Sequence, residues 1–491
     1  MIKLYLNKPE YSYEIENIIR LFFPCEKIEQ TETIPDFEPF VYANIITGEE
    51  AGCGKDNHFI KCGVAVFGKR MERETICAEN EGELNTARLI YEMLCDICQF
   101  TPKWGVLTGV RPAKLLSTLT KELGSVEKAK EDMINRLLVS PQKTNLCEYC
   151  YVAEEKAEKK SGENAFSLYV SIPFCPTRCS YCSFVSHSIE KAAKLVEPYV
   201  LLLCKEIEET AKITKELGLN LCTVYFGGGT PTQLSASQLE RVMTAINNNF
   251  DMSNVVEYTI EAGRPDTVTK EKLETIKRLG ANRISINPQT MSDQSLERIG
   301  RKHTVEQTLL AYNMAREVGI DFINMDLIAG LPEEKIEDYV KSLDEVIALN
   351  PENITVHVLS MKRSSRLVVS GEADYNADSK TVEEMLKYSE EALTCKGYKP
   401  YYLYRQSKML GNHENVGWSK DGYDCLYNIY MMNELHTVIS VGAGGVTRLK
   451  QLGGTNIERI FNFKFPYEYI DRFDQIIERK RGVIEFYDKY K

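Results

Sequence analysis

Residues 166–182 read FSLYVSIPFCPTRCSYC, and this stretch decides the fold. It opens as an apolar run rich in aromatic and β-branched residues, which predicts a buried strand. Cys175, Cys179 and Cys182 follow the strand directly, separated by three and then two residues. Three thiolates in one short loop can bind three irons of a 4Fe-4S cluster and leave the fourth iron open for a small ligand. A zinc ion would ordinarily require a fourth protein ligand, so the spacing favours the cluster.

Strand-like and helix-like segments alternate after this loop. Strands are predicted in CTVYFGGG, EYTIEAG, RISINPQ, DFINMDLIAG and ENITVHVLS, and helical segments separate them, the longest over residues 189–217. Such repetition predicts a parallel α/β sheet, and right-handed crossovers would curl it into a partial (β/α)6 TIM-like barrel over residues 165–380. In that architecture the chemistry gathers at the C-terminal ends of the strands.

The flanking segments have a different composition from the predicted barrel. Residues 1–160 mix short strands (MIKLYL, VYANIITG, FIKCGVAVFG) with a periodic helix over 83–100, which predicts an N-terminal α+β domain. Residues 381–491 begin with a helix and continue through the aromatic YKPYYLYRQ, which predicts an α+β cap that would form a substrate domain over the barrel. The VGAGG segment in this region is predicted as a turn, because it lacks a full GxGxxG and its strand–helix context.

Composition excludes several classes of protein. The 491 residues carry a net charge of −11, which argues against binding nucleic acid through the phosphate backbone. Neither a signal-peptide core nor an apolar run of ~18 residues occurs, so we expect a cytoplasmic protein with no membrane span. The 15 cysteines are too dispersed for a small disulfide scaffold. Cys95/Cys98 and Cys147/Cys150 have zinc-like spacing, and both a second metal site and plain core packing fit them.

Glycine and polar residues follow the later strands. Gly227, Gly228 and Gly229 end the second strand, where consecutive glycines allow the backbone to approach a ligand closely. Carboxylate, amide and guanidinium groups follow the next strands, namely Glu261, Arg264, Gln289, Arg301 and Asp326. Such a ring at one end of a barrel suits ribose hydroxyls and a sulfonium ligand.

These motifs resemble those of a known superfamily. A CxxxCxxC loop after the first strand resembles the radical S-adenosylmethionine (SAM) superfamily. YVSIPFC, IEA and NMDLIAGLP resemble the oxygen-independent coproporphyrinogen III oxidase group within it. TPKWGVLTGVRPAKL and the YYLYRQ and ENVGW segments are most similar to the HemZ-type branch, named for coproporphyrinogen dehydrogenase. The resemblance covers about residues 166–446.

The resemblance implies cofactors and residue roles. The cluster would be held by Cys175, Cys179 and Cys182. The SAM site would be lined by Gly228, Gly229, Thr230, Glu261, Gln289, Arg301 and Asp326, and Tyr169 would be a catalytic residue near the cluster and SAM. The implied partners are the tetrapyrrole coproporphyrinogen III and a reduced electron donor such as flavodoxin or ferredoxin.

The implied reaction is an oxidative decarboxylation in heme and porphyrin biosynthesis. A 5′-deoxyadenosyl radical removes hydrogen from propionate side chains of coproporphyrinogen III, which become the vinyl groups of protoporphyrinogen IX. Lys362, Arg363, Arg366 and Arg405 are candidate partners for substrate carboxylates, although exposed cations are more often simply solvated. The tyrosines of YKPYYLYRQ suit either stacking on a macrocycle or a packed core.

Two departures keep other functions open. The oxidase group has a fourth cysteine where this chain has Phe184, and a histidine where it has Ser171. The related heme-chaperone branch also has phenylalanine after its cysteines, and His413 to Trp418 partly matches its heme motif, although Glu414 and Gly417 break the match. A heme chaperone and a radical SAM enzyme that acts on heme are therefore the alternatives.

Overall fold

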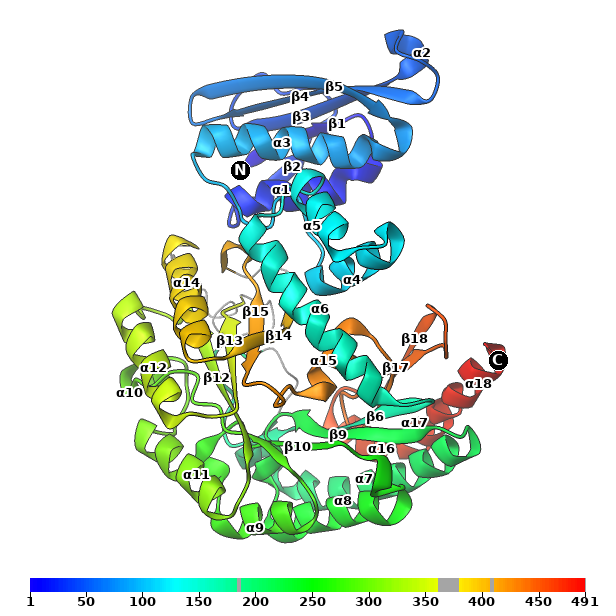
Figure 1. Ribbon diagram of the computed structural model, residues 1–491, viewed down its shortest axis with the longest axis vertical. Helices are drawn as coiled ribbons and strands as arrows, with labels where there is room; N and C mark the ends of the chain where they lie inside the picture. The colour runs from blue at the N-terminus through cyan, green and yellow to red at the C-terminus, as the bar shows by residue number, and fades with distance from the viewer. Residues whose placement is uncertain (183–186, 361–378, 407–409, 491) are drawn as a thin grey trace. The chain divides into compact units, whose positions relative to one another are not determined.

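The computed structural model describes residues 1–182, 187–360, 379–406 and 410–490 (Figure 1). The chain forms two compact units, one from Met1–Glu148 with Arg405–His413 and the other from Tyr149–Tyr404 with Glu414–Lys491. The division into three domains at residues 160/165 and 380/381 stays a prediction. Within the described ranges, no helix is both long and apolar enough to cross a membrane.

The first unit is built on a five-stranded sheet of order β2-β1-β3-β4-β5. Its strands are β1 (Ile2–Leu6), β2 (Ile28–Gln30), β3 (Phe40–Thr47), β4 (Asn57–Val66) and β5 (Lys69–Ala78). Helix α1 (Ser12–Phe22) buries Ile15, Ile18 and Ile19, which recur at helical spacing on one face. The helix that packs on β4 and β5 is α3 (Gly82–Cys98), and α2 (Gly48–Ala51) is a single turn between β3 and β4. The expected α+β composition is confirmed.

Two short helices complete this unit and a long one leaves it. These are α4 (Pro112–Leu123), α5 (Val126–Asn135) and α6 (Pro141–Ser161), which continues into the second unit. Arg405 belongs to the first unit and is buried there. Its guanidinium lies 5.2 Å from the centre of the Trp104 ring and donates to the carbonyl oxygens of Leu107 (2.5 Å) and Gly109 (3.3 Å). The side chain therefore fixes the backbone of residues 104–110.

The second unit contains the predicted parallel core. Its strands are β6 (Ala165–Ile172), β9 (Asn220–Gly228), β10 (Glu257–Glu261), β11 (Arg283–Ser285), β12 (Phe322–Ala329) and β13 (Asn353–Val358). Each pairs in parallel with the next along the sheet. The connecting helices are α7 (Ile189–Glu216), α8 (Ala236–Asn249), α9 (Lys270–Arg278), α10 (Asp293–Arg298), α11 (Val305–Glu317) and α12 (Ile336–Leu349). Helices α7, α8, α9, α11 and α12 line the outer side of the sheet in Figure 1, so the expected crossover topology is confirmed.

The C-terminal segment extends this sheet at both ends. β16 (Thr437–Val441) pairs in parallel with β6, while β15 (Asn415–Ser419) pairs antiparallel with β13. The outer strands are β14 (Lys399–Tyr404), β17 (Val446–Lys450) and β18 (Ile457–Phe461), which gives eleven strands of order β14-β15-β13-β12-β11-β10-β9-β6-β16-β17-β18. The remaining helices are α14 (Ser379–Cys395), α15 (Leu426–Asn433), α16 (Pro466–Asp471), α17 (Phe473–Lys480) and α18 (Gly482–Lys489).

A buried ion pair joins the C-terminal helices to the core. The side chains of Lys480 and Glu206 are 1% and 0% exposed, and Lys480 Nζ lies 3.1 Å from Glu206 Oε1. Glu206 also accepts hydrogen bonds from the backbone N–H of Gly442 (2.7 Å) and the hydroxyl of Tyr469 (2.6 Å). Because Gly442 opens the predicted VGAGG turn, this carboxylate fixes the turn against α7.

We predict that Lys480→Ala destabilises the protein by about 3 kcal/mol or more, because it leaves the Glu206 carboxylate buried without its cation. Lys489→Ala is the matched control, since Lys489 forms an exposed ion pair with Glu458 at 2.8 Å. That pair contributes roughly 1 kcal/mol at most. Urea unfolding followed by far-UV circular dichroism measures both. Equal losses in the two variants would contradict the assigned role of the buried pair.

Candidate functional site

The cysteine loop is held by the chain on both sides. β7 (Phe174–Cys175) pairs in parallel with β8 (His187–Ser188), and the backbone N–H of Ser180 donates to the carbonyl oxygen of Ile299 (3.0 Å). Cys175 and Cys179 are buried, Cys182 is partly exposed, and none of the three forms a disulfide. The loop therefore presents its three thiols from a fixed backbone rather than from a loose surface turn.

The glycine-rich segment after β9 packs directly on this loop. The backbone N–H of Gly229 donates to the carbonyl oxygen of Ile172 (2.7 Å), and that of Thr230 donates to Phe174 (2.8 Å). The Thr230 hydroxyl donates to Cys175 Sγ at 3.5 Å. A Cβ on Gly229 would lie 2.7 Å from the Phe174 oxygen and 3.0 Å from Cys175 Sγ, and Gly228 has a φ of +103°. These glycines therefore allow the segment after β9 to lie against the cysteine loop of the same chain.

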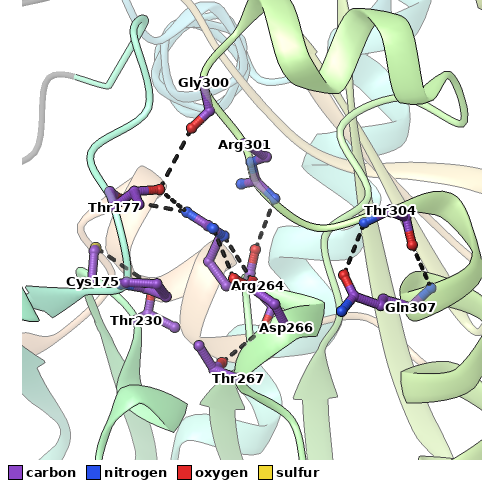
Figure 2. Close-up of polar contacts among 12 residues, drawn as sticks. Cys175, Thr177, Thr230, Arg264, Asp266, Thr267, Gly300, Arg301, Thr304 and Gln307 are labelled. Atoms are coloured by element: carbon purple, nitrogen blue, oxygen red, sulfur yellow. Dashed lines mark hydrogen bonds and ion pairs between the residues drawn. The ribbon is translucent and has the colours of Figure 1, made fainter.

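Two arginines brace the other side of the loop (Figure 2). Arg264 forms a two-pronged contact with Asp266 (3.0 and 2.9 Å) and donates to the Thr177 hydroxyl (3.0 Å). Arg301 donates to the carbonyl oxygens of Gly263 (3.0 Å) and Asn287 (2.8 Å) and to the Tyr181 hydroxyl (3.2 Å).

Both arginines are buried, and Arg301 interacts with the Cys179 thiol. Burial acts to lower the pKa of Arg301, but Tyr181 and Cys179 raise it above its ordinary value. Arg301 therefore places a fixed positive charge beside Cys179, one of the three predicted cluster ligands.

Three stacked tyrosines lie beside the carboxyl group of Glu261. Tyr225 is stacked on Tyr427 with ring centroids 4.3 Å apart, and Tyr169 is stacked 6.2 Å from Tyr225. The Tyr225 hydroxyl donates to Glu261 Oε1 at 2.5 Å. Burial, with a smaller contribution from Asp326, raises the pKa of Glu261 to about 7. Glu261 therefore exchanges its proton close to neutral pH, the range in which an active-site carboxyl is useful.

The carboxyl group of Asp326 is held ionised. Burial acts to raise the pKa of Asp326, but hydrogen bonds from His357, Asn324 and Thr355 outweigh it, so the pKa lies below its ordinary value. Asn324 Nδ2 donates to Asp326 Oδ1 at 2.7 Å, and His357 Nε2 lies 3.5 Å from Asp326 Oδ2. The two carboxyl groups thus differ in protonation because their hydrogen-bond partners differ.

Gln289 has an unusual backbone conformation. Its φ is +71°, a region that residues with a Cβ rarely adopt, and it is buried. Its backbone N–H donates to the carbonyl oxygen of Asp326 (2.8 Å), and its own carbonyl accepts from Ile328 (2.9 Å). Strained residues of this kind gather at ligand sites, where the surrounding structure holds them in place.

The predicted cluster and SAM residues are therefore all in one unit, in the C-terminal halves of its parallel strands or in the segments after them. β6 and β9 lead to the cysteine and glycine segments, β10 ends at Glu261, and β12 contains Asp326. Sequence reasoning missed Tyr225, Tyr427 and His357 as site residues. Tyr225 and His357 lie in strands already predicted, where alternation places them on the face of Glu261 and Asp326, so the strand pattern could have found these two.

Other sequence candidates have different outcomes. Phe184, Lys362, Arg363 and Arg366 lie outside the described residues. Arg405, considered as a partner for substrate carboxylates, instead fixes backbone carbonyls of the first unit.

The chemistry of the donor set fits a cluster. Across the part of the chain that the structure describes, no three His, Cys, Asp or Glu side chains converge to hold one ion, and this applies to the Cys95/Cys98 and Cys147/Cys150 pairs as well. Three thiols in one fixed loop can bind three irons of a 4Fe-4S cluster and leave the fourth iron for another ligand. Residues Cys175, Cys179 and Cys182 therefore fit a 4Fe-4S cluster.

Comparison with known proteins agrees with this geometry. A family profile described as the radical SAM superfamily matches residues 169–346. The oxygen-independent coproporphyrinogen-III oxidase-like protein HemZ of Bacillus subtilis is 35% identical over 483 residues, which cover 96% of this chain and 95% of that protein. The chain belongs to the HemZ-type group of the radical SAM superfamily. Members of the superfamily use a 4Fe-4S cluster and SAM, which confirms the two cofactors implied by the sequence.

This HemZ-type protein is also similar, more distantly, to a heme chaperone and to a solved radical SAM structure. The heme chaperone HemW of Bacillus subtilis is 31% identical over 308 residues, covering 61% of this chain and 77% of that protein. The structure titled coproporphyrinogen III oxidase (HemN) from Escherichia coli, a radical SAM enzyme, matches with a TM-score of 0.52 and 21% identity over 67% of this chain and 73% of that one. This likeness confirms the radical SAM fold class.

We predict that Gly229→Ala loses most of the iron bound after cluster reconstitution, because the new methyl group would collide with Phe174 and Cys175. Gly109→Ala is the control, since its Cβ would meet only Leu107 at an ordinary 3.7 Å. Iron analysis and visible absorbance measure the effect. Full iron content in Gly229→Ala would show that the close packing is dispensable.

A second prediction concerns Glu261 and pH. Because its folded pKa of about 7 lies above the ordinary value of 4.5, ionisation of Glu261 destabilises the SAM-free protein as pH rises between these values. Glu261→Gln stays neutral and does not lose this stability. From pH 5 to pH 8 the free energy of unfolding of the variant should therefore rise relative to that of the wild type, by roughly 3 kcal/mol at most. Urea unfolding across this pH range measures the difference, and parallel pH curves for the two proteins would refute the assignment.

Proposed function

We propose that the protein is an oxygen-independent coproporphyrinogen III dehydrogenase that acts in the cytoplasm and converts propionate side chains into vinyl groups to form protoporphyrinogen IX. One observation carries the proposal: the cysteine loop, the glycine segment and the two carboxyl groups lie at the same end of one parallel sheet. HemZ-type similarity over nearly the whole chain supports the tetrapyrrole substrate.

The residues divide into three roles in this proposal. Cys175, Cys179 and Cys182 hold the cluster. The SAM site is formed by Gly228, Gly229, Thr230, Glu261, Gln289, Arg301 and Asp326. Tyr169 is the proposed catalytic residue, and its support is its place at the start of the tyrosine stack that leads to Glu261.

The carboxyl groups bind the polar parts of SAM. Ionised Asp326 accepts hydrogen bonds from hydroxyl or ammonium groups, and Glu261 does the same once it loses its proton. The buried arginines keep the thiolate loop in place without entering the reaction. When bound, the cluster and SAM together supply the 5′-deoxyadenosyl radical by reductive cleavage of SAM.

The overall reaction balances with one outside acceptor. A propionate would lose a hydrogen atom from its β-carbon, its carboxylate carbon would depart as carbon dioxide, and one electron would pass to an acceptor as the vinyl double bond forms. A reduced flavodoxin or ferredoxin would supply the electron that cleaves SAM. The protein positions the reactants and excludes competing reactions, while the cofactors carry the difficult chemistry.

Similarity to HemW favours a heme chaperone as the second candidate. The structure gives this candidate less support at the partial heme motif. Trp418 is buried in β15, where it pairs with Ile354 of β13, and His413 is 5% exposed. A histidine that ligates heme iron from the surface would need to be accessible.

We expect the cluster-loaded wild type, incubated without oxygen with reductant, SAM and coproporphyrinogen III, to lose two carboxyl groups from the tetrapyrrole and form 5′-deoxyadenosine. Cys179→Ala is expected to do neither. Mass spectrometry of the tetrapyrrole and chromatography of the nucleoside are the measurements. SAM cleavage with no change in tetrapyrrole mass would reject this substrate, and stoichiometric heme binding by the same preparation would favour the chaperone.

A further inference from the structure

Tyr427 lies behind the other tyrosines of the candidate site and is closed off from solvent. It is 3% exposed, whereas Tyr169, Tyr225 and Glu261 are each partly exposed. Its ring is stacked on that of Tyr225, with centroids 4.3 Å and planes 20° apart, and on that of Tyr169, at 6.1 Å and 16°. Because the Tyr427 ring is itself covered, its effect on a ligand passes through the two rings that it touches.

The start of α15 is fixed to the strands of the same unit. Leu426 and Tyr427 are the first two residues of α15, and their backbone N–H groups donate to the Glu257 carboxylate at 2.8 and 3.0 Å. Glu257 Oε2 lies 3.4 Å from Arg283 Nε, and both side chains are buried. Arg283 also donates to the carbonyl oxygen of Tyr423 at 2.8 Å, just before the helix. Buried charged groups of β10 and β11 therefore set the position of the Tyr427 ring.

The contacts of Tyr427 lead back to the strand that anchors it. Glu257 begins β10 and Glu261 ends it, and their separation of four residues places both side chains on one face of the strand. Tyr427 stacks on Tyr225, whose hydroxyl donates to Glu261 Oε1 at 2.5 Å. Gly227 leaves room for this arrangement, since a Cβ there would lie 3.2 Å from the Tyr225 ring. The Tyr225 hydroxyl therefore reaches Glu261 from a ring that is held on its face by Tyr427.

We propose that Tyr427 is a positioning residue for SAM: by stacking on Tyr225, it holds the hydroxyl that orients the Glu261 carboxyl group toward the cofactor. The inference rests on the proposed function in one respect, because that proposal places Glu261 in the SAM site. Stacking uses the face of the ring, so the ring of Tyr427 acts here and its hydroxyl does not.

Four substitutions separate this role from a general loss of stability. Tyr427→Leu removes the ring and keeps an apolar side chain, whereas Tyr427→Phe keeps the ring. Tyr225→Phe keeps the stack and removes only the hydroxyl that orients Glu261, so it tests the same link should Tyr427→Leu fail to fold. Tyr339→Leu is the matched control. Tyr339 of α12 is also buried, at 1% exposed, but its hydroxyl contacts Ser389 of α14 at 2.8 Å. Both leucine variants lose a buried ring and should be less stable than the wild type.

The test is equilibrium dialysis of SAM, without oxygen, against full-length, cluster-loaded protein. We expect Tyr427→Leu and Tyr225→Phe each to raise the Kd of SAM roughly tenfold, within the range of couplings between residues of one network. Tyr427→Phe and Tyr339→Leu should match the wild type. Tyr427→Leu is also made in Glu261→Ala, where we expect a further change of less than about twofold, because the group that Tyr427 orients is already missing. Iron content and circular dichroism confirm that each variant is folded and loaded.

The outcomes either support or overturn the inference. A loss of SAM affinity that requires both the Tyr427 ring and Glu261 supports it. Equal Kd values in the wild type and Tyr427→Leu overturn it, as do a loss of the same size in Tyr427→Phe or Tyr339→Leu and an undiminished loss in the Glu261→Ala background. An unchanged Kd in Tyr225→Phe or in Glu261→Ala itself also overturns it, since no oriented contact with SAM would then exist.

The dialysis contains no tetrapyrrole and measures no turnover. A protein that binds SAM with this pattern of losses but never decarboxylates coproporphyrinogen III would reject the proposed reaction and leave this inference standing.

Discussion

The rest of the site depends on the contact between Gly229 and the cysteine loop. Two consecutive backbone N–H groups, of Gly229 and Thr230, donate to the carbonyl oxygens of Ile172 and Phe174 on either side of Pro173. A side chain at position 229 would meet Cys175 Sγ at 3.0 Å, so only glycine lets the two segments lie this close. The thiols are therefore positioned by backbone hydrogen bonds between neighbouring strands, which are more rigid than side-chain contacts on a loop would be.

Electrostatics at the strand ends follow from the same scaffold. Buried Arg301 adds positive charge behind Cys179, where thiolates are needed, while Glu261 and Asp326 lie further along the sheet. The two carboxyl groups have opposite pKa shifts because burial dominates at Glu261, which accepts mainly from Tyr225, whereas several donors outweigh burial at Asp326. One unit thus provides both an environment for thiolate–metal chemistry and a polar surface for a cationic or polyhydroxylated ligand. A site held this rigidly suits radical chemistry, in which side reactions must be prevented.

Much of the fold could be predicted from local patterns, and the rest depended on distant pairing. The apolar strands and amphipathic helices between Phe166 and Val358 are recognisable because each has its own periodicity. Nothing local in the sequence of β16 indicates that it pairs with β6, more than 250 residues earlier in the sequence. β5 was not predicted, because the segment KRMERETICA is strongly charged. In the site, the cysteine spacing identified the cluster ligands, whereas Tyr427 required knowledge of its stacking on Tyr225 in three dimensions.

The central claim is that three cysteines hold a four-iron cluster whose remaining iron is open to SAM. Electron paramagnetic resonance of the reduced, reconstituted protein, with iron and sulfide analysis before and after addition of SAM, tests it most directly. We predict about four irons and four sulfides per chain and a changed spectrum when SAM binds. A single iron or zinc per chain, or a cluster whose spectrum SAM leaves unchanged, would contradict the account.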